Sequence, residues 1–117
     1  MTYVTNPAIA WLMLVVAGIL EIVWVIGMKY SDGFTRPTPS LVTLAAALGS
    51  FWFLMLAIRV LPVGTAYAAW TGIGAVGAAV LGMVLFKEPA TAARVACIVL
   101  IVAGIVGLKV LGPDAGA

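Results

Sequence analysis

The chain has 117 residues, of which 65% are hydrophobic and 9% are charged, and its formal net charge is +2. Soluble domains carry about 25% charged residues, so this composition excludes a soluble globular protein and indicates an integral membrane protein. The chain has no histidine and a single cysteine, Cys97, which excludes a disulfide within one copy and argues against a zinc or histidine-based catalytic site. Its few charges lie between apolar runs, which favours anchoring at lipid headgroups over nucleic-acid binding.

The first apolar run covers residues 8–28 and contains a single acid, Glu21. Its length matches the ~20 residues that a helix needs to cross a hydrocarbon core of about 30 Å. Glu21 lies well inside this span, where a charged carboxylate is costly, so an acid at this depth indicates a functional site. The run is too long for a signal peptide and lacks a basic segment before it.

Three further apolar runs of spanning length follow, over residues 40–58, 64–86 and 91–111. Turn-forming residues separate them: Asp32-Gly33 and two prolines in the first connection, Pro62 in the second and Pro89 in the third. Transmembrane strands would alternate polar and apolar residues, and these runs do not. We therefore predict an all-α membrane protein in which residues 1–117 form a single domain of four transmembrane helices.

The basic residues give only a weak signal for orientation. The first and third connections with their flanks carry Lys29, Arg36, Lys87 and Arg94, and the opposite side carries Arg59 and Lys109. By the positive-inside rule, four basic residues against two give a slight preference for the orientation that places the first and third connections in the cytoplasm. Insertion in both orientations and insertion in a single orientation are both compatible with it.

Gly18 and Trp24 lie one helical turn before and one turn after Glu21, on the same face of the first helix. A small residue and an aromatic in these positions would form a recess beside the acid. The alternatives are close helix packing for Gly18 and an interfacial anchor for Trp24, which lies near the end of the span.

Ser50 is the polar residue in the middle of the second run. A lone serine in a helix usually donates a hydrogen bond to the carbonyl four residues earlier, which here belongs to Ala46. We favour this local bond, with a role beside the acid as the alternative.

The third run brings Tyr67, Trp70 and Gly74 to one face by helical spacing. Two hydrogen-bonding aromatics inside a span indicate a binding surface. The glycines at 72, 74 and 77 would weaken the helix locally, as a hinge requires. Small residues four apart also predict close packing, at Gly74, Ala78 and Gly82.

The fourth run has no polar residue in its middle except Cys97, which we interpret as a small apolar residue. Gly104 and Gly107 lie on or near its predicted contact face, so it is expected to serve packing or dimerisation. Four helices can hardly enclose a water-lined pathway alone, and a closed homodimer is the simplest solution. If the chain inserts both ways, the pair is antiparallel, as in the inverted repeats of larger transporters.

Three strings resemble the small multidrug resistance family of four-helix exporters: Gly18-x-x-Glu21-x-x-Trp24, Lys29-Tyr30-Ser31-x-Gly33-Phe34-Thr35-Arg36, and residues 61–77. The first loop, Trp24 and Ser50 resemble the guanidinium-exporter subtype rather than the subtype for polyaromatic cations. The likeness extends over nearly the whole chain. Cys97 departs from it, since relatives can carry a glycine there, and this affects only the expected packing of the fourth helix.

The resemblance implies a proton-coupled antiporter that works as an antiparallel, dual-topology homodimer in the cell (inner) membrane. It implies that Glu21 binds substrate and proton, and that four further residues line the site: Trp24, Ser50, Tyr67 and Trp70. From its place one turn before Glu21, we expect Gly18 to line the site as well. Gly72 and Gly74 would form a hinge in the third helix, and the fourth helix would be the dimerisation arm. The expected partners are guanidinium-type cations, protons and the lipid bilayer. No cofactor, metal, nucleic acid or enzymatic activity is implied.

The chemistry of guanidinium agrees with this expectation, because its planar fork of N–H donors pairs with carboxylates. Two Glu21 side chains facing each other in a dimer would hold the cation, and a proton would compete with it for the same oxygens. Three alternatives stay open: a broader exporter of quaternary ammonium cations from the same family, a small dual-topology ion channel, and a membrane assembly subunit without transport activity.

Overall fold

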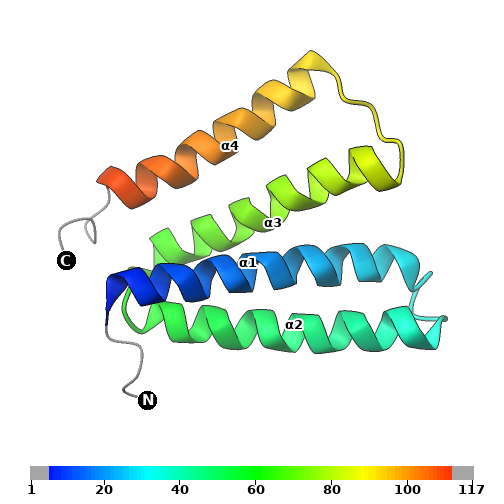
Figure 1. Cartoon of the computed structure of the whole chain (residues 1–117), viewed down its shortest axis with the longest axis horizontal. Coiled ribbons are helices and arrows are strands. Elements are labelled where there is room, and N and C mark those ends of the chain that lie inside the picture. Colours follow the sequence, from blue (N-terminus) through cyan, green and yellow to red (C-terminus); the bar gives the residue numbers. More distant parts are fainter. Residues whose placement is uncertain (1–5, 112–117) are drawn as a thin grey trace.

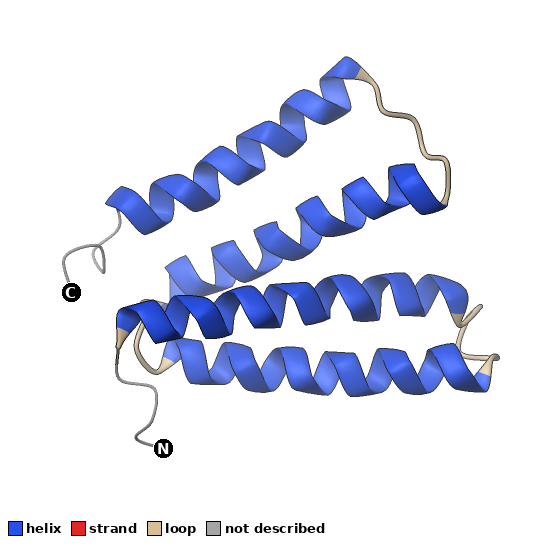
Figure 2. Cartoon of the chain, in the orientation of Figure 1, coloured by secondary structure: helices blue, strands red, loops and turns tan. Residues whose placement is uncertain are grey.

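The computed structural model of the chain describes residues 6–111. Within them every regular element is a helix (Figure 2), and all four helices are long and apolar enough to cross a membrane. Their bounds are α1 Pro7–Tyr30, α2 Pro37–Ile58, α3 Val63–Leu85 and α4 Ala92–Leu111. The all-helical class and the four predicted spans are thereby confirmed.

The helix ends differ from the prediction mainly at prolines. α2 begins at Pro37 rather than at residue 40, because a proline in the first helical turn lacks only an N–H that would have no partner in the helix. Pro89 lies in the connection before α4, as expected, and α4 starts at Ala92, one residue after the predicted start of the fourth run. At the start of α1, the Asn6 side chain caps the helix by accepting a hydrogen bond from the Ala8 amide at 2.8 Å.

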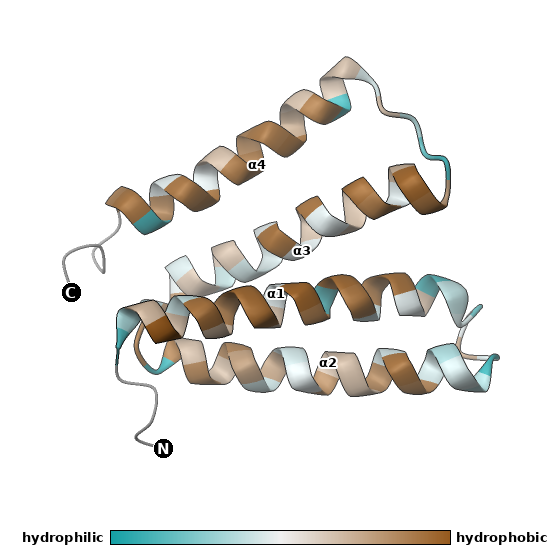
Figure 3. Ribbon diagram, in the orientation of Figure 1, coloured by the Kyte–Doolittle hydropathy of each residue, from teal (hydrophilic) through white to brown (hydrophobic). Residues whose placement is uncertain are grey.

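α1 is the central helix of the arrangement (Figure 1). It packs against α2 along its length and also against α3, whereas α4 packs on α3. The connections α1–α2 and α3–α4 lie at one end of the molecule, and the short α2–α3 connection lies at the other. Apolar residues cover the helices, and the polar residues gather mainly at the helix ends and in the connections (Figure 3), as a lipid environment requires.

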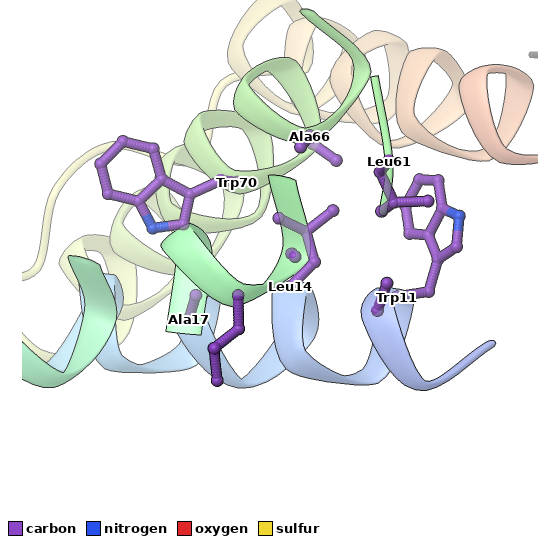
Figure 4. Packing of buried hydrophobic residues seen from close by; sticks show 10 residues of the cluster. Trp11, Leu14, Ala17, Leu61, Ala66 and Trp70 are labelled. Atoms are coloured by element: carbon purple, nitrogen blue, oxygen red, sulfur yellow. The ribbon is translucent and has the colours of Figure 1, made fainter. Parts of the chain in front are cut away.

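The buried core lies where α1, α2 and α3 meet near the α2–α3 connection (Figure 4). Its larger members are Trp11, Leu14, Leu56, Leu61 and Trp70, and small alanines fill the spaces between them. This packing fixes α1 against α3 just before Glu21 in the chain. The sequence places small residues here because helices in lipid associate by close van der Waals contact.

At the opposite end, Ser31 organises the turn after α1. Its side chain is fully buried; the hydroxyl donates to the Met28 carbonyl at 2.7 Å and accepts from the Phe34 amide at 3.1 Å. Gly33 and its two neighbours in the chain have positive φ angles, and the glycine adopts this backbone conformation without steric cost.

Candidate functional site

Glu21 lies in α1 at the contact with α3, and its side chain is buried, with 8% of its surface exposed. The carboxyl group rests against Gly74 of α3. A Cβ atom at position 74 would collide with Glu21 Oε1 and stand 2.5 Å from its Cδ. Gly74 therefore provides the space that the acid occupies.

Glycines on both helices bring α1 and α3 this close. Gly18 faces the side chain of Ile73, and Gly77 faces that of Ile22, so that a Cβ at either position would clash. The predicted close packing of Gly18 is thus present in the structure, in the same contact that buries Glu21. The two interpretations of Gly18, packing and a recess for the acid, are compatible here.

Ser50 joins three helices, which contradicts the local bond that we favoured from the sequence. Its hydroxyl donates to the Ala17 carbonyl of α1 at 2.6 Å, not to Ala46, and accepts from Trp70 Nε1 of α3 at 3.0 Å. The prediction was wrong because helical periodicity does not reveal a carbonyl of a neighbouring helix. Ala17 lies one turn before Glu21, so Ser50 holds the backbone turn that carries the acid.

Four aromatic rings form a row from α1 through α2 to α3. The ring centroids are 6.4 Å apart for Trp24 and Phe51, 5.8 Å for Phe51 and Trp70, and 5.6 Å for Trp70 and Tyr67. Sequence reasoning missed Phe51, because an apolar residue in an apolar span gives no signal except its position next to Ser50.

The rings of the row differ in how far they are buried. Trp70 is buried, whereas Tyr67 is 56% exposed and Phe51 is 50% exposed. Of the predicted site residues, the structure therefore brings Ser50 and Trp70 into direct contact in the helix core. It leaves Tyr67 at the outer end, where a second molecule could meet it.

Two buried polar atoms lack a hydrogen-bond partner within residues 6–111: Glu21 Oε2 and Trp24 Nε1. Leaving a buried polar group unpaired costs about 1–3 kcal/mol, and more for a charged one, so each such group calls for an explanation. A bound cation with N–H donors, or a proton, would satisfy the carboxylate oxygen. The unpaired oxygen is the feature of this site that points most directly to a ligand.

The predicted hinge residues lie in a continuous helix, since α3 runs unbroken from Val63 to Leu85. Gly72 faces α4, where a Cβ would meet the side chain of Ile105 at 2.8 Å. Gly72 thus serves the α3–α4 contact in this structure, and its role as a hinge stays a prediction.

We expect the substitution Ser50→Ala to lower the free energy of unfolding by about 1–3 kcal/mol, because it leaves the buried Trp70 N–H without its acceptor. Denaturant unfolding of the purified protein, followed by tryptophan fluorescence, measures this change. Ser40→Ala is the matched control, since the Ser40 hydroxyl donates to the Arg36 carbonyl in an exposed turn. Equal stability of the two variants would contradict the role assigned to Ser50.

The model of the family described as Small Multidrug Resistance protein matches residues 9–101 of the chain. Among curated proteins, the chain is 58% identical over 100 residues to a guanidinium exporter of Yersinia pseudotuberculosis, covering 86% of this chain and 96% of that protein. Proteins named guanidinium exporter from Salmonella typhimurium and Escherichia coli are 59% and 56% identical, each covering 86% of this chain and 95% of the relative. The family match over most of the chain and the high identity together show that this multi-pass membrane protein belongs to the small multidrug resistance family.

Proposed function

We propose that the chain exports guanidinium and small guanidinyl cations across the cell membrane in exchange for protons. The observation that carries the proposal is the Glu21 carboxyl group, which is buried in a membrane span and has one oxygen without a partner among the described residues. The relatives that are 56–59% identical to it over 100 residues are named guanidinium exporters, which supports the choice of substrate.

A carboxylate in this position suits a planar cation that is rich in N–H donors. Guanidinium donates two parallel hydrogen bonds to the two oxygens of a carboxylate. A low-dielectric surrounding disfavours an unpaired charge, so Glu21 takes up a proton when the cation leaves. Cation and proton then occupy the same oxygens in turn, and this competition exchanges one for the other across the membrane.

The proposal includes an antiparallel homodimer with one Glu21 from each copy. In support, none of the residues of α4 is buried within the described part of the chain, although this helix is strongly apolar. Its apolar surface suits a contact with a second α4. Two carboxyl groups that face one site titrate together rather than independently.

The neighbours of Glu21 have separate roles in this proposal. Ser50 and Trp70, which are hydrogen-bonded to each other, hold the turn of α1 that carries the acid. Trp24 and Tyr67 offer aromatic faces to the bound cation. Gly72 and Gly74 allow α3 to bend, so that the site opens to one side of the membrane at a time.

A second candidate substrate class is quaternary ammonium cations, and the exposed rings of Phe51 and Tyr67 favour it, because aromatic faces attract such ions. Competition for binding to the purified protein distinguishes the two. We expect guanidinium to displace bound methylguanidinium at a lower concentration than tetrapropylammonium does, because the ammonium ion has no N–H donor for the carboxylate. Preference for tetrapropylammonium would reverse the assignment.

A further inference from the structure

A groove of about 500 Å³ lies between the C-terminal halves of α1 and α3, away from the buried core. We call it the α1–α3 groove. Its floor is apolar and comes from Val25 and Ile26 of α1 and from Ala78 and Ala79 of α3. These small and aliphatic side chains leave a surface without hydrogen-bonding groups, which suits a hydrocarbon chain.

The rim of the α1–α3 groove is charged, with Lys29, Glu88 and Arg94 among its lining residues. Arg94 Nη2 donates to Glu88 Oε1 at 2.6 Å, and the Lys29 ammonium lies 5.3 Å from the centre of the Phe86 ring. Within residues 6–111, only one of these two positive charges, that of Arg94, is balanced by a carboxylate. Arg94 also keeps donors to spare, because a guanidinium has five N–H groups.

The rim also lies at the depth where the spans end. Lys29 is in the last turn of α1, and α3 ends at Leu85, next to Phe86. In a bilayer this is the level of the lipid headgroups, with hydrocarbon on the side of the groove floor. The groove thus presents apolar surface at acyl-chain depth and excess positive charge at headgroup depth.

We propose that the α1–α3 groove binds one anionic phospholipid, with an acyl chain on the floor and the phosphate between Lys29 and Arg94. Basic pockets between transmembrane helices are sites at which anionic headgroups bind. A second copy of the chain matches the rim less well, because the chain has six basic and only four acidic residues. The proposal concerns a lipid ligand and is independent of the exported substrate.

Native mass spectrometry of the purified full chain tests the proposal by titration with phosphatidylglycerol and with phosphatidylcholine of the same acyl chains. We expect a preference of about fivefold for phosphatidylglycerol, since each unbalanced basic residue near an anionic headgroup contributes about fivefold in affinity and Glu88 already balances Arg94. The double substitution Lys29→Gln with Arg94→Gln should remove this preference. Arg59→Gln with Lys109→Gln removes the same charge outside the groove and should retain it.

The substitution Glu88→Gln gives a test in the opposite direction. It releases Arg94 from its ion pair, so we expect phosphatidylglycerol to bind about fivefold more tightly. If the ion pair only holds the α3–α4 connection in place, Glu88→Gln weakens binding as Arg94→Gln does, and the proposal is wrong.

Equal affinity of the unmodified chain for phosphatidylglycerol and phosphatidylcholine would also overturn the proposal, as would equal losses in the two double variants. Displacement of the lipid by an equal concentration of glycerol phosphate would contradict the role of the apolar floor.

Discussion

Replacing Glu21 with glutamine is expected to weaken guanidinium binding by more than about 100-fold and to abolish its exchange for protons. The amide has nearly the same shape as the carboxylate, yet it carries no charge and cannot exchange a proton near neutral pH. Removing one partner of a buried charge pair costs about 3–5 kcal/mol, which corresponds to this loss of affinity. Calorimetric titration of the purified protein with guanidinium measures it.

The fold should survive Glu21→Gln, because the substitution replaces a buried acid that has one oxygen without a hydrogen-bond partner within residues 6–111. We therefore expect a thermal unfolding temperature no lower than that of the unmodified chain. Glu88→Gln is the matched control, since Glu88 is an exposed acid whose partner is Arg94. Guanidinium binding that persists in Glu21→Gln, or an equal loss in Glu88→Gln, would contradict the assignment of Glu21.

Gly74→Ala is the second substitution for which we expect a large effect. The new Cβ would occupy the position of the Glu21 carboxyl group, which must rotate away from α3 to avoid it. Because the obstacle is the end of a flexible side chain, the helices themselves need not separate. We expect guanidinium affinity to fall about 10- to 100-fold, equivalent to the ~1–3 kcal/mol typical of overpacking at a tight contact.

Stability should respond differently from binding in Gly74→Ala. Alanine favours a helix over glycine by about 1 kcal/mol, which offsets part of the steric cost. Gly64→Ala is the control in the same helix, because a Cβ at Gly64 meets no atom within 4 Å in the described structure. We expect it to bind guanidinium as the unmodified chain does. Unchanged binding in Gly74→Ala would show that the position of the Glu21 carboxyl group against α3 does not matter.

The spans could be predicted from the sequence because each is a long apolar run, and lipid leaves the backbone few alternatives to a helix. The position of Glu21 well inside the first span followed from counting residues along the same apolar run. The start of α2 was misplaced because Pro37 and Pro39 resemble loop residues, although the first helical turn accepts them. Local sequence patterns therefore predict the presence of each helix in this chain better than they predict where the helix begins and ends.

The partners of the site residues could not be predicted, because they depend on which faces of different helices meet. Helical spacing placed Ser50 in mid-span, but its bonds to Ala17 and Trp70 require the packed arrangement of three helices. Spacing likewise put Tyr67 and Trp70 on one face without showing that only Trp70 is buried. Phe51 became visible only through its contacts with Trp24 and Trp70.

The central claim is that protons and guanidinium compete for Glu21, and transport driven by a pH gradient tests it most directly. Proteoliposomes with an acidic lumen and a clamped membrane potential are supplied with labelled guanidinium, methylguanidinium or tetrapropylammonium outside. We predict that the two guanidinyl cations accumulate above their external concentration, that a protonophore abolishes the accumulation, and that the Glu21→Gln variant shows none. Uptake that only equalises the two concentrations and ignores the pH gradient would contradict the claim and indicate a channel.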